Sequence, residues 1–264
     1  MLHTIVLALI QSATEFLPVS SSGHLILAPR LMRWADQGML TDVALHVGTL
    51  LAVMIYFRRD VAAMFFGARD VFRRSFSTPD ARLVLNLCIA TVPALLVGFF
   101  LHDFIEQNLR SEKIIATTAV LFGILLYWAD KRGVKDGSVA KMTPKEALVI
   151  GLAQTLALIP GVSRSGITMT AARFAGIGRE ESARFSMLLA IPTIGAAGAW
   201  MALKIFTSPV GQGADMLQLG TGVAVSFAGG ALAISFLMNW LKKSSFAVFA
   251  VYRILLGVAL FFIF

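Results

Sequence analysis

The sequence predicts an all-α polytopic membrane protein with about six transmembrane helices and two re-entrant helix hairpins that form an inverted-topology repeat. Hydrophobic residues make up 57% and charged residues 14% of the 264 positions, whereas a soluble domain is about half apolar and about a quarter charged. Long apolar stretches recur along the chain, and two more are apolar at both ends but broken in the middle. We therefore expect one membrane domain over residues 1–264.

Six apolar stretches approach the roughly 20 residues with which a helix crosses a bilayer. The expected spans are Thr41–Phe57, Ala81–Leu101, Ile114–Trp128, Arg184–Phe206, Leu217–Leu241 and Phe246–Phe264. The third is short, so we expect it to take in flanking residues. Cys88 lies in the second span and is the one cysteine of the chain. It is expected to be a small buried side chain without an internal disulfide.

Two broken stretches, Met1–Ala28 and Pro144–Ala175, contain Pro, Gly and runs of Ser between their apolar ends. Backbone that leaves helical geometry at membrane depth must be buried in protein or line a wet cavity, because lipid cannot bond its N–H and C=O groups. We expect each stretch to be a re-entrant helix–loop–helix hairpin. The apolar stretch Ile5–Ile10 has no preceding Lys or Arg and no cleavage site, so it is expected to stay in the mature protein.

Basic residues set the expected orientation. The predicted loops 57–81 and 130–145 carry five Lys or Arg residues each, and short basic loops lie on the cytoplasmic side of a membrane. If both hairpins are re-entrant, these loops share that side, and the first hairpin enters from the outer face and the second from the inner face. Membrane anchoring then explains the net charge of +8, and no nucleic-acid partner is expected.

The two broken stretches also match each other at one constant offset. Val-Ser-Ser-Ser-Gly at 19–23 corresponds to Val-Ser-Arg-Ser-Gly at 162–166, with further Leu and Gln matches upstream. We expect repeat 1 over about 1–130 and repeat 2 over about 144–264. Inverted repeats place their functional site near the midplane, where broken helices meet, and N–H groups at helix starts attract anions. A phosphate site is therefore expected between the two breaks.

The breaks carry a family resemblance. Gln11-Ser-Ala-Thr-Glu15, followed by Phe-Leu-Pro-Val-Ser-Ser-Ser-Gly-His24, resembles the first motif of the undecaprenyl-pyrophosphate phosphatases, the bacitracin-resistance phosphatases. Pro160-Gly-Val-Ser-Arg-Ser-Gly-Ile-Thr168 is similar to their second motif, and shorter likenesses at 45–50, 183–192 and 252–257 extend the resemblance over nearly the whole chain. It implies hydrolysis of undecaprenyl pyrophosphate to undecaprenyl phosphate and inorganic phosphate. That activity would recycle the lipid carrier for cell-wall synthesis and confer bacitracin resistance.

Glu15 is a carboxylate inside an apolar hairpin, which is costly unless it meets a cation or a hydrogen-bond network. Gln11 lies one helical turn earlier, on the same face. Two oxygen ligands at this spacing can hold a hard divalent cation, Mg²⁺ or Ca²⁺, that is shared with substrate phosphates, and the resemblance implies the same metal site. The family has Glu or Gln at the first position, so Gln11 leaves the site one charge poorer.

Three further residues are candidates for catalysis. The resemblance suggests Ser21 as nucleophile, and His24, three residues later, could act as base or as acid for the leaving group; a water activated by these groups is the alternative. Arg164 places a guanidinium in the second break, where its planar donors fit phosphate oxygens. Seven other residues of the breaks are expected to bind substrate: Ser20, Ser22, Gly23, Gly161, Ser163, Ser165 and Thr168.

Two other ionisable residues lie within the expected spans. His46 is expected to be structural, and Arg253 either binds phosphate or pairs with an acid such as Asp42. The expected partners are undecaprenyl pyrophosphate and membrane lipids, in the bacterial inner membrane, with the site open to the periplasmic face. Whether two copies form a homodimer is left open.

Two other functions remain open at this point. Inverted repeats with broken helices are also a transporter architecture, so a secondary transporter or lipid flippase is the main alternative. A non-catalytic lipid-binding partner of a synthase complex is the third. The combination of Glu, His and Ser favours hydrolysis, because an anion transporter needs donors but neither a nucleophile nor a base.

Overall fold

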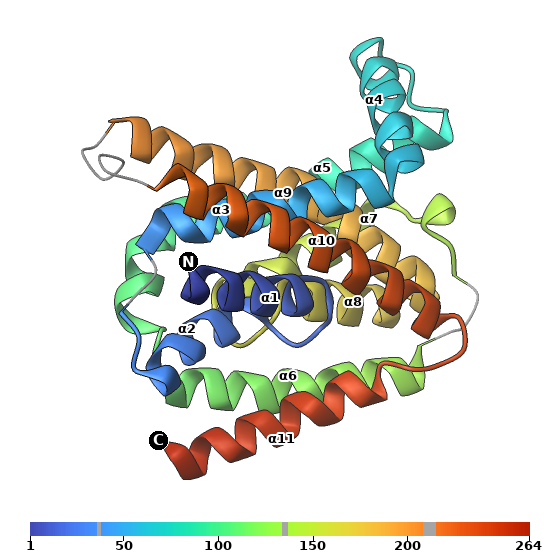
Figure 1. Cartoon of the computed structure of the whole chain (residues 1–264). Coiled ribbons are helices and arrows are strands. Elements are labelled where there is room, and N and C mark those ends of the chain that lie inside the picture. Colours follow the sequence, from blue (N-terminus) through green and yellow to red (C-terminus); the bar gives the residue numbers. More distant parts are fainter. Residues whose placement is uncertain (36–37, 134–136, 208–214) are drawn as a thin grey trace.

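In a computed structural model that describes residues 1–35, 38–133, 137–207 and 215–264, the chain is a bundle of α-helices (Figure 1). Within these ranges no β-strand occurs, and the all-α prediction is confirmed. Short 3₁₀ turns, η1 (Val139–Lys141) and η2 (Leu156–Leu158), precede and follow α7. The helices are α1 (Leu2–Phe16), α2 (Ser21–Met32), α3 (Gly38–Tyr56), α4 (Arg58–Phe72), α5 (Pro79–Asn108), α6 (Glu112–Arg132), α7 (Pro144–Thr155), α8 (Arg164–Phe174), α9 (Arg179–Thr207), α10 (Met216–Leu241) and α11 (Ala247–Ile263).

Each predicted span coincides with one helix, namely α3, α5, α6, α9, α10 and α11. The third span takes in flanking residues as expected, since α6 starts at Glu112 and ends at Arg132. By length and composition, α5, α6 and α10 are each able to cross a membrane among the described helices, and the bent pair α3 and α4 adds a fourth if it is one span. The polytopic membrane fold is therefore confirmed, while the number of about six spans stays a prediction.

The two broken stretches are helix–break–helix units, as predicted. Residues 17–20 separate α1 from α2, and residues 159–163 follow η2 and precede α8. In Figure 1 α1, α2 and α8 lie between the α6–α11 pair and the layer that contains α3, α9 and α10. α1 packs on α10, α7 on α5, and α8 on α6 and α9. Both breaks are thus enclosed by helices, which keeps their unpaired backbone groups away from lipid.

Several helix contacts of the first half of the chain have a counterpart in the second half. α1 packs on α10 as α7 packs on α5, while α3 pairs with α9 and α6 pairs with α11. These contacts are preserved when α1, α3, α6 and α10 are exchanged for α7, α9, α11 and α5. The repeats over about 1–130 and 144–264 and the inverted relation between them stay predictions.

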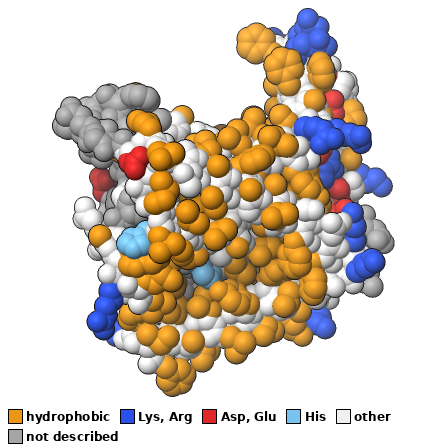
Figure 2. Space-filling view, viewed as in Figure 1, with side chains coloured by type: hydrophobic (Ala, Val, Ile, Leu, Met, Phe, Trp, Pro, Cys, Tyr) orange, Lys and Arg blue, Asp and Glu red, His pale blue; other side chains and the backbone are white. Residues whose placement is uncertain are grey.

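The face of the bundle seen in Figure 2 is mostly apolar. Phe100 of α5, Leu232 of α10 and Phe262 of α11 are each more than two thirds exposed, as expected of side chains that face lipid rather than water. Cys88 of α5 is exposed as well, so the prediction that it is buried is wrong. An apolar stretch of a membrane helix has a lipid-facing side as well as a buried one.

The sequence pattern does not predict α4, whose residues lie within the predicted loop 57–81. It turns away from α3 by 87° and stands out from the bundle (Figure 1). Charged residues near both of its ends exclude it from a search for long apolar stretches. Lys and Arg side chains gather at this end of the molecule (Figure 2). Lys135, of the second basic loop, lies outside the described residues.

Close packing of α3 on α10 depends on Gly48. A Cβ at this position would lie 2.7 Å from the Cβ of Ser226 and closer still to the carbonyl oxygen of Val223. We expect Gly48→Ala to lower the free energy of unfolding by about 1–3 kcal/mol through overpacking. Gly220→Ala, where no atom lies within 4 Å of the added Cβ, is the matched control and should not destabilise the protein. Thermal unfolding in detergent measures both variants, and equal melting temperatures would contradict the packing.

Candidate active site

The second helix of each hairpin starts in the same way. Ser20 and Ser163 have φ values of 77° and 72°, which residues with a Cβ rarely adopt. Each serine caps its helix: Ser20 Oγ accepts from the N–H of Gly23 at 3.4 Å, and Ser163 Oγ accepts from the N–H of Gly166 at 3.0 Å. The repeat in the sequence is therefore also a repeat of backbone geometry, at two positions that the surrounding structure has to hold in place.

The two breaks also contact each other. Ser165 Oγ donates to the carbonyl oxygen of Leu17, in the first break, at 3.1 Å. A Cβ added to Gly23 would lie 3.6 Å from the Cα of Gly161. Gly161 itself has a φ of 91° and leaves no room for a side chain against Thr118. The small residues predicted to bind substrate thus let the two backbones approach closely.

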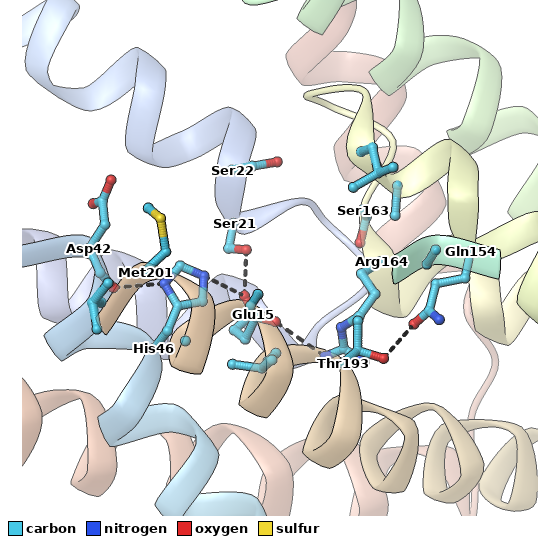
Figure 3. A pocket seen from close by; sticks show the side chains of 17 residues that line it. Glu15, Ser21, Ser22, Asp42, His46, Gln154, Ser163, Arg164, Thr193 and Met201 are labelled. Atoms are coloured by element: carbon cyan, nitrogen blue, oxygen red, sulfur yellow. Dashed lines mark hydrogen bonds and ion pairs between the residues drawn. The ribbon is translucent and has the colours of Figure 1, made fainter. Parts of the chain in front are cut away.

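Glu15 is the group on which both breaks converge (Figure 3). Its side chain is 6% exposed. Oε2 accepts from Ser21 Oγ at 2.6 Å and from Gln11 Nε2 at 3.2 Å, and Oε1 accepts from Arg164 Nη2 at 3.2 Å. His46 Nε2 lies 3.9 Å from Oε2. The carboxylate can be buried because a cation and two other donors surround it.

Arg164 reaches Glu15 from the first residue of α8. Its Nη1 donates to the carbonyl oxygen of Ser186 at 2.7 Å, and Thr168 Oγ1 lies 2.7 Å from the hydroxyl of the same serine. Arg164 Nε is buried and has no hydrogen-bond partner among the described residues. The guanidinium is therefore held at two nitrogens, and its Nε–H is left without a protein partner.

A cavity of about 360 Å³ lies beside these groups. Five predicted site residues line it: Glu15, Ser21, Ser22, Ser163 and Arg164. Its wall also contains apolar side chains such as Leu158, Ile194 and Met201. A cavity of about 1050 Å³ shares Ser22, His46 and Met201 with the first and extends to the ion pair of Arg30 and Glu112. A polar end beside an apolar wall suits a lipid with a charged head group.

His24 is not brought to Ser21. Its Nδ1 lies 2.7 Å from the carbonyl oxygen of Ser20, and its Nε2 lies 2.7 Å from the hydroxyl of Tyr252. Both ring nitrogens are therefore engaged, Nδ1 by the first break and Nε2 by α11, and His24 is not among the residues that line the cavity. The other predicted residues outside the lining are buried around the breaks or behind Glu15: Gln11, Ser20, Gly23, Gly161, Ser165 and Thr168.

His46 lies in the site although the sequence suggested a structural role. It lines the cavity from α3, and its Nδ1 is 2.8 Å from the carbonyl oxygen of Asp42. Because a carbonyl oxygen only accepts, Nδ1 carries the proton in the neutral ring and Nε2 turns a lone pair toward Glu15. The sequence signal that could have identified His46 as a site residue is its position within residues 45–50, one of the stretches that resemble the family.

Arg253 holds the second break. Its Nη2 donates to the carbonyl oxygens of Gly161 at 2.9 Å and of Val162 at 2.8 Å, and the residue is 1% exposed. Within the described part of the chain it forms no ion pair, so the alternative that it pairs with an acid such as Asp42 is wrong for these residues. It instead satisfies carbonyl groups that the break leaves outside helical hydrogen bonding.

Glu15 and Gln11 are the two oxygen-bearing residues available for a divalent cation that the substrate would help to bind, although the Gln11 amide turns Nε2 rather than Oε1 toward Glu15. Gln11 Oε1 is buried and has no hydrogen-bond partner among the described residues, one turn from the carboxylate. No group of three or more His, Cys, Asp or Glu residues that could hold a metal occurs in the same residues. Such a pair of protein oxygens holds Mg²⁺ when substrate phosphates and water complete the shell.

Comparison with known proteins gives full-length matches. A family model described as bacitracin resistance protein BacA matches residues 4–259. The undecaprenyl-diphosphatase of Saccharophagus degradans is 47% identical over 260 residues, covering 98% of this chain and 97% of that protein. The undecaprenyl-diphosphatase of Dinoroseobacter shibae is 47% identical and covers 99% of this chain and 97% of that protein. The undecaprenyl-diphosphatase of Alcanivorax borkumensis is 48% identical and covers 98% of this chain and 97% of that protein. The chain therefore belongs to the bacitracin resistance protein BacA family.

Proposed function

We propose that this chain hydrolyses undecaprenyl diphosphate to undecaprenyl phosphate and inorganic phosphate. The observation that carries the proposal is the Ser21 hydroxyl, 2.6 Å from a Glu15 carboxylate whose other oxygen meets Arg164. The names of relatives that match over nearly the whole chain support the same activity. The reaction recycles a lipid carrier for cell-wall synthesis and confers bacitracin resistance.

Ser21 is the nucleophile of this proposal and Glu15 is its base. A serine hydroxyl becomes reactive when a neighbouring base takes its proton, and Glu15 Oε2 already accepts that hydrogen bond. Attack of Ser21 Oγ on the terminal phosphorus breaks the bond to the bridging oxygen, which leaves on undecaprenyl phosphate. Water then hydrolyses the phosphoserine. His46 Nε2, 3.9 Å from the carboxylate, is the next acceptor for the proton.

Arg164 stabilises the phosphoryl group during transfer. Charge spreads over the three equatorial oxygens of this group in the transition state, and a planar guanidinium matches their geometry. The Ser186 carbonyl and Glu15 hold Arg164 before substrate arrives, which removes the need to reorganise it during the reaction. Ser22 and Ser163 add hydroxyl groups to the same cavity.

The cofactor of this proposal is a divalent cation, Mg²⁺ or Ca²⁺. Among the described residues that line the smaller cavity, the carboxylates Glu15 and Asp42 outnumber the one arginine, Arg164. A diphosphate is itself multiply negative, so the protein alone does not balance its charge. Glu15 would hold the cation, and a half-turn of the Gln11 amide, which now donates from Nε2 to Glu15, would bring its unpartnered Oε1 to the same cation. Bound there, it would neutralise charge on the phosphates.

In this proposal the chain lies in the inner membrane of a bacterium, and its site opens to the periplasmic face. The end of the bundle that carries α4 is rich in Lys and Arg (Figure 2), as expected of a cytoplasmic surface. The larger cavity instead reaches Arg30 and Glu112, at the end of α2 and the start of α6. In Figure 1 these helix ends lie opposite α4.

A transporter or flippase is the competing function, because broken helices enclosed in a bundle are a transporter architecture. The bond between Ser21 and Glu15 favours hydrolysis, since anion transport needs donors but no base on a serine. Purified protein in liposomes separates the two. Translocation of undecaprenyl diphosphate without phosphate release would support the transporter, and release in detergent supports the phosphatase.

Ser21→Ala is expected to lower the rate of phosphate release from undecaprenyl diphosphate by at least about 100-fold. Ser22→Ala is the matched control, because Ser22 lines the cavity but its hydroxyl bonds Ser20 at 3.3 Å rather than Glu15. It should stay within about tenfold of the unaltered protein. Mass spectrometry after rapid quenching should find phosphate on Ser21. Equal rates in the two variants would refute Ser21 as nucleophile and favour an activated water.

Chelation by EDTA should stop phosphate release, and Mg²⁺ or Ca²⁺ should restore it. Gln11→Glu adds a carboxylate where the amide oxygen has no partner, so the cation concentration for half-maximal release should fall by about tenfold. Gln218→Glu is the control, because Gln218 lies in the first turn of α10 and lines neither cavity. Its metal requirement should not change. An unchanged requirement in Gln11→Glu would place the cation elsewhere.

A further inference from the structure

We propose that α4 and the turn that follows it, residues 58–76, form an anchor for anionic lipid head groups at the membrane surface. α4 is bent by 87° from α3, which packs along α10 in the bundle. Membrane-spanning helices tilt by about 20° on average, so α4 lies within roughly 25° of the membrane plane. Its 15 residues reach about 22 Å, short of the hydrocarbon core of about 30 Å.

The face of α4 toward the bundle is closed. Gly67 leaves no room for a side chain against the backbone at the start of α5. Asp60 pairs with Arg184 of α9, and Asp70 accepts a hydrogen bond from Thr78 Oγ1 at 3.0 Å. The charge of Asp60 is thus balanced by Arg184, and Asp70, which faces Thr78, is the one carboxylate of α4 that remains beside its arginines.

The outer face of α4 presents aromatic side chains. Phe65 is 73% exposed and Phe72 is 92% exposed, and Phe66 and Phe76 are about half exposed. Figure 1 shows the helix standing away from the other helices. Exposed aromatic rings on a short amphipathic helix that carries basic residues are typical of helices that lie in the membrane interface.

The arginines of this segment decide which surface it fits. Among the described residues none of them forms an ion pair, and Arg69 lies over the ring of Phe66 at 6.0 Å. Cations beside apolar rings match the phosphates and the acyl boundary of an anionic leaflet. Their charge also opposes contact between this helix and the same helix of a second copy. The five are Arg58, Arg59, Arg69, Arg73 and Arg74.

Site-specific quenching by lipid tests the anchor. Phe72→Cys in a Cys88→Ser background takes a nitrobenzoxadiazole fluorophore, and the protein is placed in nanodiscs of phosphatidylcholine and phosphatidylglycerol. Doxyl-labelled lipid of either head group serves as quencher. We expect phosphatidylglycerol to associate with position 72 at least about fivefold more strongly than phosphatidylcholine. This is about the factor in affinity that a single arginine contributes near an anionic membrane surface.

Charge variants on α4 and off it provide the control. Replacing Arg69, Arg73 and Arg74 together by Gln should bring the preference close to one, in protein whose circular dichroism and phosphate release in detergent are unchanged. Lys242→Gln with Lys243→Gln, in the turn after α10, should leave the preference intact. Equal quenching by both lipids with all arginines present would overturn the proposal. Energy transfer between labelled copies without lipid quenching would also overturn it, in favour of a second copy on this face.

Discussion

The contact between Glu15 and Arg164 is the interaction on which the site depends. A carboxylate that is 6% exposed inside an apolar bundle needs a cation, and removal of one partner of a buried pair destabilises a protein by about 3–5 kcal/mol. The two groups belong to different hairpins, 149 residues apart. The pair therefore holds the two breaks against each other and places the Ser21 hydroxyl on the remaining carboxylate oxygen.

The backbone around this pair is arranged to let the hairpins approach. Left-handed φ values at Ser20 and Ser163 turn the chain sharply before α2 and α8, and each serine caps the helix that follows it. Arg253 satisfies the carbonyl groups that the second break exposes, and His24 ties Ser20 to Tyr252 of α11. Residues of the last helix thus support the turns and leave the cavity to Glu15, Ser21, Arg164 and His46.

Much of this arrangement follows from local sequence. Apolar stretches indicate the long helices because burial in lipid needs continuous hydrophobicity, and interrupted stretches indicate the breaks. Glu15, Ser21 and Arg164 are identified because charged and polar side chains are costly to bury at membrane depth and therefore mark functional sites. The two histidines are harder to place: His24 is near Ser21 in sequence, but its ring turns toward Tyr252, whereas His46 reaches Glu15 from another helix. Such choices depend on how distant helices pack, as does the partner of Arg253. α4 is missed for a different reason, because the charged residues near both of its ends interrupt its apolar stretch.

The rate of phosphate release from undecaprenyl diphosphate by Glu15→Gln, supplied with Mg²⁺, tests the central claim most directly. Glutamine keeps the size of the side chain and an oxygen toward Ser21, but it removes the charge that faces Arg164 and the base that takes the serine proton. We predict a loss of at least about 100-fold in protein that stays helical and monodisperse in detergent. A rate within a few-fold of the unaltered protein would contradict the account, because the hydrolysis would then proceed without the carboxylate on which both hairpins converge.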